Sequence, residues 1–359
     1  MRVLLINHSP KQSGVALYAS NLCRELRTEG IRVEIADISD PSGLGFVSSQ
    51  AHRIRRSIEI ANGLLRLPKG FDVYHATSQT ISISHVLLKP TVVTIHDTAA
   101  FLTYKDVVAG LLFKMAFSFA KSAEMVICPS SFTREEAVSR LGVNPNRVVV
   151  IPLGVDHALF HRRDKGEARR RLSLQQNVKL ILSVSTTLKH KNLPVLLRTL
   201  QLIRKKQPTA RLVRVGAPNP TTLELSALAK QLGIAESITY MKPNNEELAI
   251  LYNACDLFLH TSTYEGFGTP LVEAMASGLP VVASNATSIP EVVGDGGILI
   301  DPLDADGFAS QATNVLTDEV LAKQMAERGI IRSQHFSWEK CAKDTLKTYE
   351  AAFRYETMF

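Results

Sequence analysis

The stretch STYEGFGTPLVEAMASGLPVV, at residues 262–282, places two glutamates and a glycine-rich turn around the start of one predicted helix. Gly266 and Gly268 allow the backbone to approach a ligand closely, because glycine adopts conformations that other residues exclude. Thr269 is expected to cap a helix over about 270–277, since threonine is a good cap and proline, the next residue, favours the first helical position. The stretch therefore predicts a strand, a tight turn and a helix whose start is open to a ligand.

The two glutamates of this stretch are suited to different parts of a nucleotide sugar. The free N–H groups and the positive dipole end of a helix N-terminus suit a diphosphate. Glu273, in the first turn or just beyond it, only accepts hydrogen bonds and can hold a diol such as a ribose. Glu265 lies in the turn, where it can meet a sugar hydroxyl. Either glutamate alone would favour a solvated side chain on a capped helix, but together with Gly266, Phe267 and Gly268 they indicate a binding site.

These residues resemble the signature of the retaining glycosyltransferases of family 4, in which a Glu-Gly-Phe-Gly turn precedes a second glutamate eight positions after the first. The resemblance extends over nearly the whole chain. It includes TIHDTAAF at 94–101, VICPSSFTREEAV at 126–138, IPLGVD at 151–156, LKHKNLPVLL at 188–197 and FSWEKCAKDTLKTYEAAF at 336–353. It implies an α/β fold of the GT-B architecture, with two Rossmann-like doubly wound domains that face a cleft.

The composition is that of a globular protein with two domains. A chain of 359 residues exceeds the size at which one hydrophobic core usually stops growing, and 45% of its residues are hydrophobic. The four cysteines are scattered without a CxxC pair, so neither a zinc site nor a disulfide framework is indicated, and a reducing cytoplasm fits best. The N-terminus is expected to be a strand and not a signal peptide, and no apolar region reaches the ~20 residues of a membrane span.

Short β-branched runs alternate with longer helical stretches, which predicts parallel sheets with crossover helices. In the first half the expected strands are Val3–Ile6, Val33–Ala36, Val73–His75, Val92–Ile95, Val126–Cys128 and Val148–Ile151. In the second half they are Leu180–Val184, Arg211–Val215, Ile238–Met241, Leu257–His260, Pro280–Ala283 and Ile298–Ile300. We expect an N-terminal acceptor-side domain at 1–155 and a donor-binding domain at 156–337. The resemblance implies that a last helix, at about 338–359, packs back on the first domain.

The net charge of +7 is concentrated in two segments. Residues 51–70 and 161–171 each carry about +4 by count of their charged side chains. We interpret 161–171 as a solvated helix face. For 51–70, isoleucines and leucines alternate with arginines, so a solvated face and an amphipathic helix that meets anionic lipid are equally open. Nucleic acid is not an expected partner, because no binding-module motif is present and aromatic residues make up only 6% of the chain.

Lys191 follows a predicted strand and a short turn, in SVSTTLKHKN at 183–192. The resemblance implies that this lysine binds the nucleotide diphosphate and stabilises charge on the leaving group. The family usually has glycine and arginine where Ser185 and Thr186 stand here. Relatives with threonine at this place carry arginine just before the lysine, where this chain has His190. One diphosphate-binding cation is therefore missing or replaced by a weaker one.

Four further positions complete the candidate site. Gly14 follows the first strand and opens a helix, so its backbone can face a phosphate or the transferred sugar. His96 ends a strand and matches the family's histidine, which implies contact with the sugar or the acceptor; His75, also at a strand end, is a poorer candidate. Met241 and Lys242 end and follow a strand where the family reads the nucleobase through backbone contacts, and the lysine departs from the usual glycine.

The sequence therefore predicts a retaining hexosyltransferase that uses a nucleoside diphosphate sugar and a glycan or lipid-linked saccharide acceptor in surface polysaccharide synthesis. UDP-glucose is the expected donor, and GDP-mannose is the alternative because TLKHKN resembles mannosyltransferase relatives. A nucleotide-sugar epimerase, a sugar phosphorylase or a non-catalytic binding subunit on the same fold remain rival readings. The expected catalytic residues are His96, Lys191 and Glu265. The expected donor-binding residues are Gly14, Thr186, His190, Lys191, Glu265, Gly266, Phe267, Gly268, Thr269 and Glu273.

No cofactor is expected besides the nucleotide-sugar cosubstrate. Carboxylates and histidines with metal-ligand spacing are absent from the sequence, so we expect metal independence. Lys191 and the N-terminus of the helix that begins near Pro270 would supply the positive charge that stabilises the departing diphosphate. The expected location is the cytoplasm, with peripheral contact at the inner membrane face as the open question raised by residues 51–70.

Overall fold

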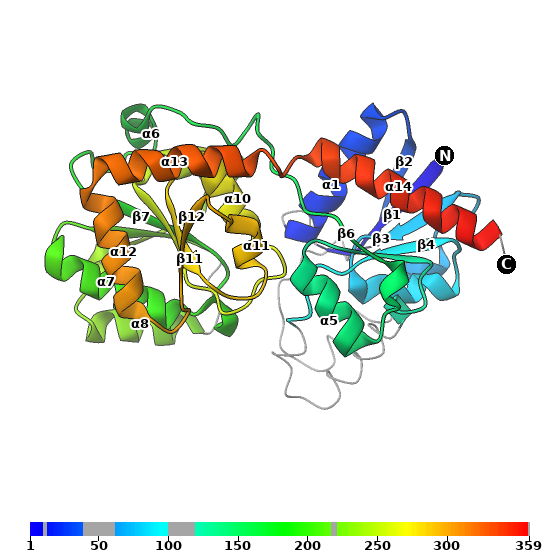
Figure 1. The fold of residues 1–359 in the computed structure, drawn as a ribbon, viewed down its shortest axis with the longest axis horizontal. Helices are drawn as coiled ribbons and strands as arrows, with labels where there is room; N and C mark the ends of the chain where they lie inside the picture. Colours follow the sequence, from blue (N-terminus) through cyan, green and yellow to red (C-terminus); the bar gives the residue numbers. More distant parts are fainter. Residues whose placement is uncertain (10–12, 39–61, 100–118, 217–220, 358–359) are drawn as a thin grey trace. The chain divides into compact units, whose positions relative to one another are not determined.

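A computed structural model describes residues 1–9, 13–38, 62–99, 119–216 and 221–357 (Figure 1). The chain divides into two compact units, each of which is described by itself. Unit 1 comprises Met1–Gly154 and Trp338–Phe359, and unit 2 comprises Val155–Ser337. Each unit is built on one parallel sheet.

Unit 1 contains a six-stranded sheet of order β2-β1-β3-β4-β5-β6. Its strands are β1 (Arg2–Asn7), β2 (Arg32–Asp37), β3 (Val73–Ala76), β4 (Thr91–Thr94), β5 (Met125–Cys128) and β6 (Val148–Val150). The inner strands are buried on both faces of the sheet. Successive side chains of a strand point to opposite faces, so each inner strand contributes to two hydrophobic clusters. In β1, Val3 and Leu5 pack into one hydrophobic cluster while Leu4 and Ile6 pack into another. This double burial explains why the inner strands are nearly continuous apolar runs, whereas the edge strand β2 is mostly exposed and carries charged residues.

The two faces of the unit 1 sheet are covered by helices from distant parts of the chain. These are α1 (Gly14–Thr28), η1 (Gln79–Val86), α5 (Ser131–Leu141), η2 (Pro145–Arg147) and α14 (Trp338–Thr357). The α14 helix packs beside α1, and Figure 1 shows the two side by side over the strands. Trp338 and Tyr349 of α14 share a buried cluster with Tyr18 and Leu22 of α1. The last helix of the chain therefore completes the core of the unit that contains the first strand.

Unit 2 contains a second six-stranded parallel sheet, of order β12-β11-β10-β7-β8-β9. Its strands are β7 (Leu180–Val184), β8 (Arg211–Val215), β9 (Ile238–Met241), β10 (Leu257–His260), β11 (Val281–Ser284) and β12 (Gly297–Ile300). Counted within the unit, this is the 3-2-1-4-5-6 arrangement of a doubly wound sheet read from the other edge. The order reverses between β7 and β10, and ligands in such sheets bind beyond the carboxyl ends of the strands at this point.

Helices cover both faces of the unit 2 sheet. They are α6 (Lys165–Arg171), η3 (Lys189–Lys191), α7 (Leu193–Lys206), α8 (Thr221–Gln231), η4 (Ala235–Ser237), α9 (Asn245–Ala254), α10 (Thr269–Ala276), α11 (Ile289–Val293), α12 (Ala305–Thr317) and α13 (Glu319–Ser333). A large buried cluster joins α7 and α12 to the strands. On the other face α10 packs against α13, and α9 packs against α6. The sheet is thus held rigidly beneath the loops that leave its carboxyl edge.

The predicted fold class is confirmed. All twelve predicted strands are present, and each observed end lies within one residue of the predicted one. Most of the predicted basic helix at 51–70 lies outside the described residues, including its arginines at 53, 55 and 56. Of the helices that the structure describes, none combines the length and the apolar character needed to cross a bilayer.

Candidate functional site

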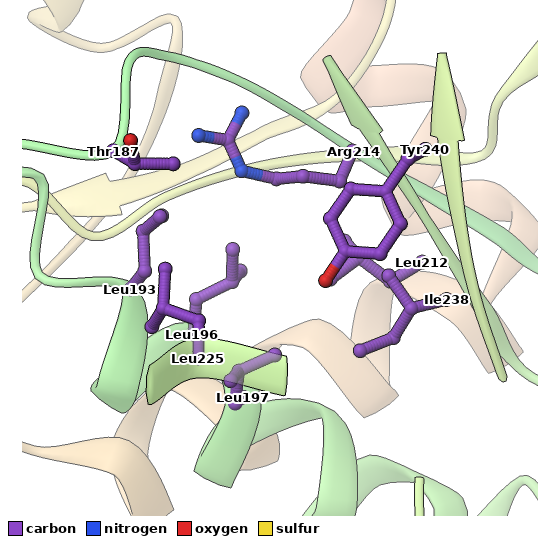
Figure 2. A pocket seen from close by; sticks show the side chains of 9 residues that line it. All are labelled: Thr187, Leu193, Leu196, Leu197, Leu212, Arg214, Leu225, Ile238 and Tyr240. Atoms are coloured by element: carbon purple, nitrogen blue, oxygen red, sulfur yellow. The ribbon is translucent and has the colours of Figure 1, made fainter. Parts of the chain in front are cut away.

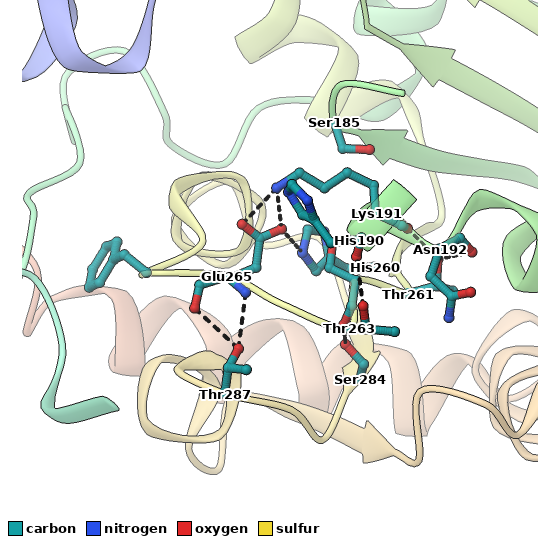
Figure 3. Close-up of polar contacts among 12 residues, drawn as sticks. Ser185, His190, Lys191, Asn192, His260, Thr261, Thr263, Glu265, Ser284 and Thr287 are labelled. Carbon is teal, nitrogen blue, oxygen red and sulfur yellow. Dashed lines mark hydrogen bonds and ion pairs between the residues drawn. The ribbon is translucent and has the colours of Figure 1, made fainter. Parts of the chain in front are cut away.

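The centre of the candidate site is an ion pair between Lys191 and Glu265 (Figure 3). The Lys191 Nζ lies 2.8 Å from each of the two carboxylate oxygens of Glu265. Lys191 ends η3, which follows β7, and Glu265 lies in the loop after β10. Because β7 and β10 are neighbouring parallel strands, their carboxyl ends place these loops together at the point where the strand order reverses. The structure therefore brings together two residues that are 74 positions apart in the chain.

His260 is the third member of this polar cluster. Its Nε2 lies 2.9 Å from Oε1 of Glu265, and its side chain is only 2% exposed. The ring stacks on Phe258, with ring centroids 5.9 Å apart. Since a carboxylate only accepts, Nε2 carries the proton and donates it to Glu265. His260 thus fixes the carboxylate from the strand side while Lys191 holds it from the loop side.

The ionisation of Glu265 follows from these contacts. Burial alone would raise the pKa of its carboxyl group, but the Lys191 ammonium and the His260 hydrogen bond lower the pKa to well below its usual range. Glu265 is therefore a carboxylate throughout the neutral pH range. A carboxylate fixed in this way can accept hydrogen bonds from sugar hydroxyls, and the adjacent ammonium can meet an anion.

Two residues beside the pair adopt left-handed backbone conformations. Asn192, next to Lys191, has φ 54°, and its side-chain amide donates to the Pro302 carbonyl at 2.7 Å. Thr287 has φ 53°, a conformation that is strained for a β-branched residue. Its hydroxyl accepts from the Glu265 N–H at 3.0 Å and donates to the Glu265 carbonyl at 3.1 Å. The surrounding fold thus holds strained backbone where it fixes the ion pair.

The helix after the glycine-rich turn differs at its start from the sequence prediction. Thr269 was expected as the N-cap, but Gly268 is the cap and Thr269 is the first residue of α10. Gly268 has φ 97°, which favours glycine, and a Cβ at this position would lie 2.8 Å from Cδ1 of Leu271. Thr269 therefore joins the helix, and no side chain caps its first N–H groups. Pro270 has no N–H group and the Leu271 N–H donates to the Gly268 carbonyl at 2.9 Å, so the start of α10 offers an anion its positive dipole end and the Thr269 N–H.

Replacing Gly268 by alanine is expected to lower the free energy of unfolding by about 1–3 kcal/mol, because it combines positive φ with a clash. Gly14→Ala is the matched control, since a Cβ at Gly14 would meet nothing within 4 Å. Chemical denaturation of both variants measures the difference. Equal stability of the two would show that the turn tolerates a side chain.

Glu273 lies one turn into α10 and is partly buried. Burial raises the pKa of its carboxyl group to about 7, although the hydrogen bond from Tyr252 opposes the rise. The Tyr252 hydroxyl donates to Oε2 of Glu273 at 2.7 Å, and Tyr252 itself is completely buried in α9. Glu273 is thus poised to change its charge near neutral pH, in contrast to the permanently ionised Glu265.

The predicted residues of unit 1 lie at the carboxyl ends of its strands. Gly14 is the first residue of α1, and the Ser13 hydroxyl caps that helix by accepting from the Ala16 N–H at 3.2 Å. His96 follows β4, donates from Nε2 to the Thr77 carbonyl at 2.9 Å, and is partly buried. Burial lowers the pKa of His96, against smaller opposing effects of Thr77 and Asp97, so its ring is neutral at neutral pH. A neutral ring protonated at Nε2 leaves Nδ1 as an acceptor.

His75 has a different environment from His96. Its ring is wholly buried, with Nδ1 2.7 Å from the Tyr349 hydroxyl and Nε2 2.8 Å from the Thr94 hydroxyl. Burial lowers the pKa of His75 to about 3. His75 is thus a neutral structural link between β3, β4 and α14.

The remaining predicted residues lie in unit 2, at various distances from the ion pair. Thr186 follows β7, and the carbonyl of His190 accepts from the Thr263 N–H at 2.8 Å. Gly266 and Phe267 are buried in the turn after Glu265, where the Phe267 ring meets Phe336 edge-on. Met241 and Lys242 end and follow β9, the outer strand, and Lys242 is exposed.

Several residues of the site were not predicted from the sequence. His260, Tyr252 and Thr287 each contact one of the two glutamates, yet none belongs to the Glu265–Glu273 motif. His260 is the last residue of a predicted strand. Because ligands bind beyond the carboxyl ends of parallel strands, this position could have identified His260 as a site residue. Among the residues described, no group of three or more His, Cys, Asp or Glu side chains is placed to hold a metal ion.

Comparisons with known protein families match both units. The family model described as Glycosyltransferase Family 4 matches residues 12–159, and the model described as Glycosyl transferases group 1 matches residues 164–332. The chain is 31% identical over 238 residues to O-antigen chain mannosyltransferase B of Escherichia coli. That alignment covers 64% of this chain and 61% of the relative, so the chain spans less than two thirds of its length.

Solved structures with the same fold cover nearly the whole chain. Sucrose-phosphate synthase (tll1590) from Thermosynechococcus elongatus has a TM-score of 0.81 and 21% identity, over 99% of both chains. Anabaena Alr3699/HepE in complex with UDP-glucose has a TM-score of 0.79 and 21% identity, over 98% of this chain and 100% of that chain. At this level of identity the likeness shows a shared fold.

Proposed function

Since this chain belongs to family 4 of the glycosyltransferases, we propose that it transfers a hexose from a nucleoside diphosphate sugar to an acceptor hydroxyl with retention of anomeric configuration. The observation that carries the proposal is the Lys191–Glu265 pair at the carboxyl ends of β7 and β10. It offers a cation for a diphosphate and a carboxylate for sugar hydroxyls within one cluster. The start of α10 adds its positive dipole end and the Thr269 N–H, which the cap residue Gly268 cannot cap with a side chain.

Two donors are supported by different observations. UDP-glucose is the lead, because a solved structure with the same fold contains it. GDP-mannose is the alternative, because a sequence relative is named as a mannosyltransferase. In either case Glu273 would accept from the ribose hydroxyls, and the ends of β9 at Met241 and Lys242 would lie beside the base. Thr186, His190 and the turn at Gly266, Phe267 and Gly268 would surround the diphosphate and the sugar.

In the proposed reaction the bond between the anomeric carbon and the diphosphate oxygen breaks while the acceptor oxygen bonds to the same face. The acceptor proton passes to the departing diphosphate oxygen. Lys191 and the positive dipole end of α10 stabilise the negative charge that develops there, because fixed dipoles and charges cost no reorganisation during the reaction. Glu265 orients the sugar, and neutral His96 of unit 1 accepts from a hydroxyl of the sugar or the acceptor.

Thermal-shift titration with UDP-glucose, GDP-mannose and a dTDP-sugar tests donor binding. A ligand that binds only the folded protein raises its stability by RT ln(1 + [L]/Kd), about 2.7 kcal/mol at 100 times Kd. We expect one base to raise the melting temperature more than the others, and the same donor to support transfer to a saccharide acceptor. No shift with any of the three donors would contradict the proposal.

Chelation by EDTA is expected to leave transfer activity unchanged, because Lys191 and the α10 N-terminus are the cationic groups assigned to the diphosphate. The measurement compares initial rates before and after exhaustive dialysis against EDTA. Loss of activity that magnesium or manganese restores would establish a metal-assisted mechanism instead.

The acceptor is proposed to be a glycan or a lipid-linked saccharide in surface polysaccharide synthesis, with peripheral contact at an anionic membrane surface. The support for membrane contact is the basic, amphipathic pattern of residues 51–70 alone. Co-sedimentation with anionic vesicles at low salt tests it. Replacing the three arginines at 53, 55 and 56 by glutamate should abolish sedimentation, and a wild-type protein that does not sediment would remove this part of the proposal.

A further inference from the structure

Arg214 is a buried cation directly beneath the loop that follows β7. It is the fourth residue of β8, and only 5% of its surface is exposed. Figure 2 shows its guanidinium group extending toward Thr187 above a floor of leucine side chains. Its Nη2 donates to the Ser185 carbonyl at 2.5 Å and to the Thr186 carbonyl at 3.0 Å. Further N–H groups donate to the carbonyls of Ser183 and Val215.

Every acceptor that the structure gives Arg214 is uncharged. Within the described part of the chain the other buried arginine is Arg169, and its Nη2 lies 2.7 Å from the carboxylate of Asp256. No such carboxylate faces Arg214 among the described residues. Burial lowers the pKa of Arg214 to about 10, which still leaves it charged at neutral pH. A buried charge without a counter-ion costs several kcal/mol, so the site lacks one negative charge.

The contacts of Arg214 also orient the backbone above it. The peptide bonds of this loop are trans, so each carbonyl points opposite to the N–H of the following residue. Because the guanidinium binds the carbonyls of Ser185 and Thr186, the N–H groups of Thr186 and Thr187 are directed away from it. A backbone N–H group that faces away from a buried cation, as that of Thr186 does, can donate to an anion. The same loop continues to Lys191, the cation assigned to the diphosphate.

The close approach of the loop to Arg214 depends on a glycine. A Cβ at Gly216 would lie 2.0 Å from the Ser185 carbonyl oxygen and 3.1 Å from Nη1 of Arg214. The Ser185 N–H also donates to the Val215 carbonyl at 3.1 Å, which joins the carboxyl ends of β7 and β8. The loop, the arginine and the glycine are therefore packed as one unit.

We propose that Arg214 is a positioning residue for the donor diphosphate, acting from beneath the loop that it holds and through the backbone N–H group of Thr186. The inference rests on the proposed function, because the diphosphate is the missing negative charge. Relatives carry a glycine and an arginine at the places where this chain has Ser185 and His190, and their arginine meets the ligand directly. The proposal explains how this chain can bind a diphosphate without that arginine. The positive charge is supplied here by a side chain that does not touch the ligand.

The test measures binding of UDP and GDP, and of uridine and guanosine, by calorimetry. Arg214→Met is expected to weaken binding of the preferred diphosphate at least tenfold and of its nucleoside less than twofold. Arg214→Lys, which keeps the charge, should retain diphosphate affinity to within about fivefold of wild type. The control is Arg169→Met, which removes a buried arginine at the other end of the sheet and should leave the diphosphate-to-nucleoside ratio unchanged.

The outcomes separate this inference from the proposed function. Wild-type protein that binds neither UDP nor GDP would overturn the proposed function. Wild-type protein that binds a diphosphate, together with an Arg214→Met variant whose diphosphate and nucleoside affinities are unchanged or fall equally, would overturn the role of Arg214. If Arg214→Met does not fold, Arg214→Gln replaces it as the uncharged variant, and equal diphosphate affinity of the Gln and Lys variants would be decisive against the inference.

Discussion

Replacing Lys191 by alanine is expected to lower turnover at saturating donor by about 100- to 1000-fold, while donor affinity falls much less. The ammonium would act on charge that grows as the diphosphate departs, so its loss affects the transition state more than the bound donor. Lys191→Arg is not expected to restore the rate, because a planar fork cannot occupy the place of a compact charge between two oxygens. Donor-hydrolysis kinetics at saturating donor measure the effect.

The Lys191→Ala substitution should also destabilise the fold. A second variant is therefore required to separate the loss of stability from the loss of turnover. Alanine leaves the mostly buried Glu265 carboxylate with His260 as its remaining side-chain partner, which should cost roughly 2–4 kcal/mol of unfolding free energy. The double variant with Glu265→Gln removes the uncompensated charge and should recover most of this stability without recovering turnover. Normal turnover in a folded Lys191→Ala variant would eliminate the proposed role of the lysine.

Replacing Glu273 by glutamine is expected to weaken nucleotide binding by about 1.5–3 kcal/mol, or roughly 10- to 150-fold, because the ribose hydroxyls lose a charged acceptor. The same change should raise stability at pH 8. The folded protein retains the Glu273 proton up to a pKa of about 7, whereas the unfolded chain releases it near 4.5. Stability contributed by protonated Glu273 is therefore present below pH 4.5 and is lost as the pH rises to 7, by roughly 2–3 kcal/mol.

Binding and stability should thus depend on pH in opposite directions. Nucleotide affinity should increase as the pH rises through about 7, since the ionised carboxylate is the better acceptor. Tyr252→Phe is the matched control, because loss of its hydrogen bond should raise the pKa of Glu273 further and move the binding midpoint upward. Wild-type nucleotide affinity in a folded Glu273→Gln variant would remove Glu273 from the donor site.

The strands could be predicted because most of them are short apolar runs, and those inside the sheets, such as β3, β4 and β10, are buried along their whole length. The turn at Gly266 and Gly268 could also be predicted from local sequence, because glycines between a strand and a helix indicate a turn. The cap was wrong by one residue because it depends on a positive φ at Gly268 and on its packing against Leu271, which sequence spacing does not reveal. Thr269 is a good cap by residue type, but the backbone geometry of the preceding glycine decided the outcome.

Contacts between distant segments could not be predicted in the same way. The role of Arg214 depends on the neighbouring positions of β7 and β8, and the pairing of Tyr252 with Glu273 depends on how α9 lies against α10. An isolated arginine in a strand or tyrosine in a helix gives no such signal. The family resemblance implied that one diphosphate-binding cation is missing here or replaced by a weaker one, and the structure was needed to find a buried arginine close to that loop.

The position of α14 in the sequence affects the order in which the two units can fold during synthesis. Unit 2 is one continuous stretch, so all of its core residues are available as soon as Ser337 has been synthesised. Unit 1 takes core residues from both ends of the chain, and Val3 and Leu5 share a cluster with Tyr349 and Ala352. While the chain is still growing on the ribosome, that face of the first sheet has no cover from α14. Strand β1 therefore belongs to a core that cannot close until the residues of α14 have been synthesised, after those of unit 2.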